Sequence, residues 1–124
     1  MYATISADIV SSTSLSDVET IELKQYIEGQ LKMLETLSPN FWGRLIKGDY
    51  IECVIPNVSD AFRIALIIKN SIKAFKVNKT ANNKPFYTYG ARIAIGIGSM
   101  RIVDREQGIM DGEAIYLSGR SITK

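Results

Sequence analysis

Two aspartates stand where a folded chain could bring them together to do chemistry. Asp8 lies near the end of a β-branched, apolar segment, and Asp49 follows Gly48 in a turn between two apolar segments. Two carboxylates at adjacent strand ends would repel each other unless a cation lay between them, and hard cations prefer such oxygen ligands. The pattern therefore predicts a Mg²⁺ or Mn²⁺ site at Asp8 and Asp49. The alternatives are ordinary turn chemistry for Gly-Asp and a loop-capping role for Asp8.

A short polar run continues from Asp8 toward an expected helix start. Backbone amides in such a run can cradle a polyphosphate, because N–H groups near a helix N-terminus attract anions. We therefore take as candidate nucleotide-binding residues Ile9, Val10, Ser11, Ser12 and Thr13.

Missing and rare residue types narrow the chemistry further. The chain contains no histidine and a single cysteine, Cys53. This excludes catalytic triads that need a histidine base, and zinc sites built from several cysteines. Cys53 alternates with Ile51 in an apolar segment, which predicts a core thiol and not a nucleophile. Carboxylates, lysines, arginines and backbone groups are left to carry any chemistry.

The length and composition are typical of one globular domain. The 124 residues are 46% hydrophobic and 23% charged, and a chain of this size buries enough surface to fold without disulfides. No apolar run approaches the ~18 residues of a membrane span, and the N-terminus lacks the pattern of a signal peptide. We predict a single cytoplasmic domain over residues 1–124 that does not contact a membrane.

Charge is unevenly distributed along the chain, although the net charge is only +2. Residues 61–103 contain no carboxylate, and their eight basic residues are Arg63, Lys69, Lys73, Lys76, Lys79, Lys84, Arg92 and Arg101. Such a segment can indicate an anionic partner, either a nucleotide or a nucleic acid. We favour the simpler interpretation of a solvated helix face followed by a lysine-rich loop.

Hydrophobic periodicity divides the chain into alternating strands and helices. Strands are expected over Tyr2–Val10, on both sides of Gly48 within Phe41–Pro56, and over Arg92–Gly98. Helices are expected from a capping box at Ser16 to Leu37, over Ala61–Phe75, and beginning within Glu113–Ile122. Residues 78–84 and 103–112 are expected in loops and turns. The order β-α-β-β-α-β predicts an α+β, ferredoxin-like (split βαβ) palm domain with an antiparallel or mixed sheet. Two long helices should lie on one face of the sheet, with no helix on the other.

Four segments together resemble the motifs of class III adenylate and guanylate cyclase domains. Ala7–Ser14 is similar to their D-I-x-G-F-T opening, and Lys47–Asp49 with the apolar strand after it is similar to their K-x-x-G-D hairpin. Arg92–Gly98 is similar to R-I-G-I-H-T-G, and Gly112–Arg120 to G-x-x-V-N-x-A-x-R. The four segments occur in the family's order and span nearly the whole chain.

The resemblance implies a two-metal cyclase site. Asp8 and Asp49 fall on the two metal-binding aspartates, and the Ile9 carbonyl falls on the backbone ligand. Arg120 falls on the arginine that stabilises the transition state. Class III cyclases build each site across a dimer interface, so the resemblance also implies a homodimer and a nucleoside triphosphate ligand. A cyclase continues well beyond this arginine, so we expect the domain to be incomplete at its C-terminus.

Positions that read the base and orient the ribose depart from the family pattern. The purine-selecting lysine is replaced by Leu45, beside which Arg44 is a candidate nucleotide contact. The acidic partner that reads the purine falls on Ile109, with Asp111 nearby. The asparagine that orients the ribose falls on Tyr116.

The last segment, Met110–Arg120, is closer still to the SatD family of small bacterial proteins, which share a D-G-x-A-(F/Y)-x-x-A-R motif. We therefore predict a SatD-like or degenerate cyclase-like domain that binds a divalent metal and a nucleotide, with a regulatory role and little or no turnover. The alternative is an active nucleotidyl cyclase, a phosphorus–oxygen lyase that makes a cyclic nucleotide by two-metal catalysis. A nucleic-acid-binding module is a distant third.

Overall fold

The computed structural model describes residues 1–11, 16–75 and 89–122, and the expected loop at 78–84 lies outside this part. The elements, in chain order, are β1 (Tyr2–Ser11), α1 (Asp17–Leu37), β2 (Trp42–Ile46), β3 (Tyr50–Ile55), the short 3-10 helix η1 (Val58–Asp60), α2 (Ala61–Ala74), β4 (Tyr89–Gly98), β5 (Ile102–Asp104), β6 (Ile109–Asp111) and α3 (Glu113–Ile122).

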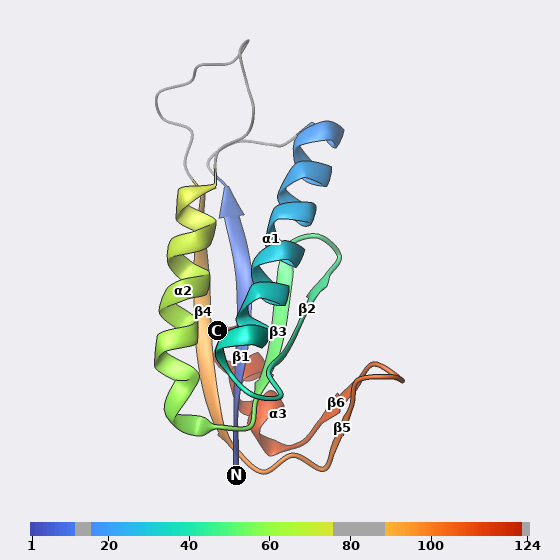
Figure 1. Cartoon of the computed structure of the whole chain (residues 1–124), viewed down its shortest axis with the longest axis vertical. Coiled ribbons are helices and arrows are strands. Elements are labelled where there is room, and N and C mark those ends of the chain that lie inside the picture. The colour runs from blue at the N-terminus through green and yellow to red at the C-terminus, as the bar shows by residue number, and fades with distance from the viewer. Residues whose placement is uncertain (12–15, 76–88, 123–124) are drawn as a thin grey trace.

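The main sheet has four antiparallel strands in the order β2-β3-β1-β4. Strand β1 lies inside the sheet, between β3 and β4 (Figure 1). Successive side chains of a strand point to opposite faces. Ala3, Ile5 and Ala7 are accordingly buried in the apolar core, and Thr4 and Ser6 are buried on the other face. This α+β architecture with an antiparallel sheet confirms the predicted fold class.

The two long helices lie on one face of the sheet, as predicted (Figure 1). Helix α1 begins at the predicted capping box, in which Ser16 Oγ accepts a hydrogen bond from the Glu19 amide and the Glu19 carboxylate accepts one from the Ser16 amide. Each helix buries one stripe of its surface against the sheet. The apolar side chains of these stripes are Leu23, Ile27, Leu31 and Leu34 from α1, and Ala61, Ile64, Ala65, Ile68 and Ile72 from α2.

Helix α3 lies on the opposite face, so the expectation that no helix would lie there is wrong. Its buried residues are Ala114, Ser118 and Ile122, and hydroxyl groups make its hydrogen bonds to the sheet. The Thr4 hydroxyl donates to the Ala114 carbonyl at 2.7 Å, and the Ser118 hydroxyl hydrogen-bonds to both Thr4 (2.9 Å) and Ser6 (2.8 Å). Gly96 of β4 lets the helix approach, because a Cβ there would lie 2.2 Å from the Ala114 carbonyl oxygen. A hydroxyl layer thus fixes α3 where an apolar stripe fixes α1 and α2.

Strands β5 and β6 form a hairpin in the segment where only charged turns were expected. Ion pairs hold it in place: Arg101 pairs with Asp111 inside the hairpin, and Arg105 pairs with Glu35 of α1. The Arg44 guanidinium of β2 also donates to the Gly108 carbonyl. The hairpin therefore packs beside the β2 edge of the main sheet, as Figure 1 shows.

Two further expectations concern the environment of Cys53 and the length of apolar helices. Cys53 is fully buried, and this burial raises the pKa of its thiol far above the usual range, so the thiol stays protonated as expected of a core residue. Within the described ranges, no helix is both long and apolar enough to cross a bilayer.

The close approach of α3 to β4 predicts a sharp contrast between two glycines of the same strand. Gly96→Ala should lower the free energy of unfolding by about 1–3 kcal/mol, because its Cβ would overlap the α3 backbone. Gly90→Ala should be close to neutral, since a Cβ there meets nothing within 4 Å. Urea unfolding followed by Trp42 fluorescence measures both. Equal stabilities of the two variants would contradict this packing.

Candidate functional site

The structure brings the backbones of the two candidate metal aspartates to the same end of the sheet. Asp8 of β1 pairs with Tyr50, the first residue of β3, and the Ile9 amide donates to the carbonyl of Asp49 at 2.9 Å. Strand β1 extends further than predicted, to Ser11, because β4 continues to pair with it. Asp8 is therefore the last residue of β1 that pairs with β3, whereas the pairing of β1 with β4 continues for three more residues.

The Ile9 carbonyl points toward the same end of the hairpin. In an antiparallel sheet, the N–H and C=O groups of one residue point to the same neighbouring strand. Because the Ile9 amide reaches Asp49, the Ile9 carbonyl also lies on that side, beyond the first residue of β3. Two carboxylates and one carbonyl oxygen thus come from adjoining backbone positions.

The Asp8 carboxylate already has a cationic partner. Arg92 lies opposite Asp8 in the β1–β4 register, and its guanidinium donates from Nε to one carboxylate oxygen at 3.0 Å and from a terminal nitrogen to the other. The hydrogen bond and the negative charge of Asp8 raise the pKa of Arg92 above its ordinary value. Asp8 is half-buried and Arg92 is exposed, so solvent screens this pair and its contribution to stability is small. A metal at Asp8 would have to displace Arg92 or share the carboxylate with it.

A second ion pair lies on the same sheet face, across strands β2 and β3. Arg44 lies opposite Glu52, and its guanidinium donates to one Glu52 oxygen at 3.0 and 3.3 Å. The Arg44 guanidinium also lies 5.2 Å from the Trp42 ring centroid. Contact with a nucleotide would require Arg44 to leave these partners. Sequence analysis assigned Arg44 to the nucleotide and missed its partner Glu52.

Arg120 lies on the exposed side of α3, away from the hydroxyl layer that joins the helix to the sheet. Its guanidinium lies 5.3 Å from the ring centroid of Tyr116, one helical turn earlier. Both residues border a hollow of about 360 Å³, whose lining is Glu52, Met110, Asp111, Gly112, Ile115, Tyr116, Gly119 and Arg120. Neither Asp8 nor Asp49 lines this hollow.

The candidate phosphate-binding run is described only in part. Ser11 ends β1, and Ser12 and Thr13 lie outside the described residues. Val10 is half-exposed and lines a hollow of about 240 Å³ with Gly90, Ala91, Lys69 and Lys73. Sequence analysis did not connect these two lysines to Val10, because only the fold shows that α2 reaches the start of β4.

No protein-family model and no curated protein matches the chain. Among solved structures, that of a bacterial light-regulated adenylyl cyclase is similar, with a TM-score of 0.61 and 15% sequence identity. The alignment covers 98% of this chain and 68% of that chain. At this identity the likeness shows the fold alone. The chain therefore has a cyclase-like fold, and its resemblance to the SatD family stays a prediction from the sequence.

The Asp8–Arg92 pair predicts that Arg92 competes with a cation for Asp8. Arg92→Gln should tighten the binding of Mn²⁺ alone by no more than a few-fold, because the exposed ion pair that competes for Asp8 is weak. Arg101→Gln, which removes a similar exposed pair with Asp111, should leave Mn²⁺ affinity unchanged. Calorimetric titration distinguishes the two. Weaker Mn²⁺ binding by Arg92→Gln than by the wild type would contradict competition at Asp8.

Proposed function

We propose that the chain is a degenerate cyclase-like domain that binds a divalent cation together with a nucleoside triphosphate and acts as a regulatory module. The observation that carries the proposal is the hydrogen bond from the Ile9 amide to the Asp49 carbonyl. It joins the strand end that holds Asp8 to the turn that holds Asp49, as a shared cation would require.

The donor chemistry fits Mg²⁺ or Mn²⁺. The Asp8 and Asp49 carboxylates and the Ile9 carbonyl are hard oxygen donors, and phosphate oxygens of the ligand would complete the coordination. No three cysteine, aspartate or glutamate side chains gather within the described residues, so a cation would depend on backbone and ligand oxygens as well. When bound, the cation would neutralise phosphate charge and polarise the phosphate oxygens.

Three positions favour binding without rapid turnover. Leu45, at the purine-selecting position, packs against the apolar core and offers no hydrogen bond to a base. Ile109 replaces the acidic purine-reading residue, and Tyr116 replaces the ribose-orienting asparagine. A ligand would therefore be held mainly by its phosphates, and its reacting hydroxyl would be poorly oriented.

The retention of Asp8, Asp49 and Arg120 favours an alternative, an active nucleotidyl cyclase. In that reaction Arg120 would stabilise negative charge that develops at the α-phosphate. Because Arg120 faces away from its own sheet, it would act on a ligand held by a second copy of the chain. A homodimer is thus part of the cyclase alternative.

Binding can be tested by titrating Mn²⁺-ATP and Mn²⁺-GTP into the purified chain. Asp8→Asn and Asp49→Asn should each weaken binding about tenfold or more, because each removes one charged metal ligand. Loss of a single hydrogen bond to a charged group already costs about 1.5–3 kcal/mol, which corresponds to about tenfold or more in affinity. Glu35→Gln is the matched control, since Glu35 is also a partly exposed carboxylate paired with an arginine and lies on α1, away from the candidate metal site. Unchanged binding in both Asp8→Asn and Asp49→Asn would contradict the proposal.

Turnover separates the regulatory module from the active enzyme. We expect cyclisation well below about 1 s⁻¹, the low end of usual enzyme rates, with any of the four common nucleoside triphosphates and Mn²⁺. The assay should be run at protein concentrations high enough to form dimers. A rate near 1 s⁻¹ that disappears in Arg120→Ala would establish the cyclase alternative instead.

A further inference from the structure

Strand β4 forms one edge of the main sheet, and its outer backbone groups are directed away from β1. The Ile9 amide donates to Asp49 on the β3 side. The backbone N–H and C=O groups of odd-numbered β1 residues therefore point to β3, and those of even-numbered residues point to β4. The odd-numbered residues of β4 therefore direct their N–H and C=O groups to the free edge. They are Tyr89, Ala91, Ile93, Ile95 and Ile97, and no strand of the described chain pairs with β4 on that side.

This edge lacks the features that usually prevent pairing with another chain. Protected edges are short, or carry a proline, a bulge or a projecting charge. Strand β4 has ten residues and no proline, and its one charged residue, Arg92, is paired with Asp8. Among the residues that the structure describes, the Lys69 ammonium contacts one end of this edge and donates to the Ala91 carbonyl at 3.1 Å.

An exposed apolar ridge runs beside the free edge. Ile95 is 37% exposed and Ile97 48%, while Phe62 and Leu66 of α2 are 69% and 43% exposed. Residues four and seven positions after Phe62 share its side of the helix, and these are Leu66 and Lys69. The bond from Lys69 to Ala91 places that side of α2 next to the β4 edge. We call Phe62, Leu66, Ile95 and Ile97 the edge ridge.

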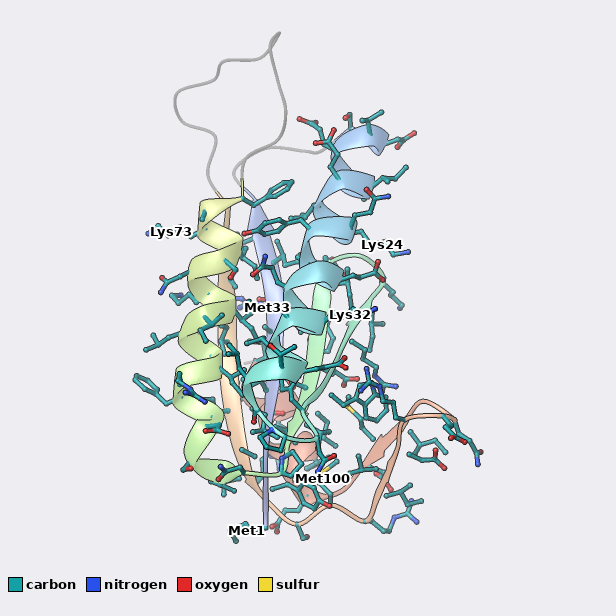
Figure 2. All side chains as sticks on the ribbon, in the orientation of Figure 1. Met1, Lys24, Lys32, Met33, Lys73 and Met100 are labelled. Atoms are coloured by element: carbon teal, nitrogen blue, oxygen red, sulfur yellow. The ribbon has the colours of Figure 1, made fainter. Side chains whose placement is uncertain are left out.

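The surroundings of the edge ridge are basic. Lys69 and Lys73 lie on α2, which contains no carboxylate, whereas Arg63 is paired with Asp60 just before the helix. Lys73 projects from the side of α2 that faces away from α1 (Figure 2). A second copy of the chain docked on this edge would bring like charges together, whereas an acidic partner would meet complementary charge.

We propose that the free edge of β4 binds an extended, acidic peptide segment that adds a fifth strand to the sheet. Backbone hydrogen bonds to Ile93, Ile95 and Ile97 would supply affinity, as in other cases of strand addition. The partner's side chains that face α2 would be apolar where they cover the edge ridge and acidic where they meet Lys69 and Lys73, at the other end of the same face. This site is separate from the aspartates and requires neither metal nor nucleotide.

The probe is a fluorescein-labelled nine-residue peptide with threonine at every even position, valine at positions 1, 3 and 5 and glutamate at positions 7 and 9, so that valines and glutamates project from the same face of the strand. Its binding is followed by fluorescence anisotropy. It should bind at least about tenfold more tightly than the same peptide with lysine in place of glutamate, and added salt should weaken it. Methylating two of its backbone nitrogens that face β4 should weaken binding about tenfold, because two hydrogen bonds of about 0.5–1.5 kcal/mol each are lost.

Two substitutions at one position test the protein side. Ile95→Pro removes an N–H that faces the free edge while keeping the pairing with β1, and it should weaken peptide binding about tenfold. Ile95→Thr keeps the N–H and should retain most of the affinity. If circular dichroism shows that Ile95→Pro does not fold, the affinity of the wild-type protein for the methylated peptide tests the proposal instead.

Three results would overturn the proposal. The first is equal binding of the acidic and basic peptides, or no binding by either. The second is unchanged affinity after methylation of the peptide backbone. The third is a two-chain mass in light scattering that Ile95→Pro abolishes, because it would assign the edge to a second copy of this chain.

Discussion

Strand β1 is hydrogen-bonded along both of its edges and covered on both of its faces, and this double confinement determines the rest of the structure. One face must be apolar to pack against α1 and α2, which Ala3, Ile5 and Ala7 achieve. The other face carries Thr4 and Ser6, whose hydroxyls are fully buried and satisfied by Ser118 and Ala114 of α3. An unsatisfied buried hydroxyl would cost about 1–3 kcal/mol, so β1 and α3 specify each other's position.

The alternation along β1 also determines what the candidate site contains. Asp8 continues the polar face of Thr4 and Ser6 along β1, and the antiparallel register places Arg92 beside it and Tyr50 on its other side. Arg44 and Glu52 extend this charged face across β3 and β2. The same strand therefore supports the fold with its first half and presents the candidate metal and nucleotide groups with its second half. The neighbouring strand β4 completes the site on one side and leaves a free edge on the other.

Much of this architecture could be predicted from local sequence patterns. The capping box at Ser16, the apolar stripe of α1 and the turn at Gly48 are encoded within a few residues, and the structure confirms all three. The pairing of Asp8 with Arg92 could not be predicted, because the residues are 84 positions apart and only the strand register brings them together. The face on which α3 packs could not be predicted, because buried hydroxyls and close approach at glycines hold the helix together with only two buried apolar side chains, Ala114 and Ile122. Gly96 and Gly98 were the available signal, because glycines in a strand indicate the close approach of another group.

The central claim is that Asp8, Ile9 and Asp49 together hold a divalent cation. The most direct measurement is an amide NMR spectrum of the wild-type chain recorded while substoichiometric Mn²⁺ is added, because the paramagnetic ion broadens signals near its binding site. Broadening should appear first at the amides of Ile9, Asp49 and Tyr50, while those of Asp111 and Glu113 on the β6–α3 side persist. Broadening that starts at Asp111 and Glu113, or that spreads evenly over the exposed carboxylates, would contradict the account.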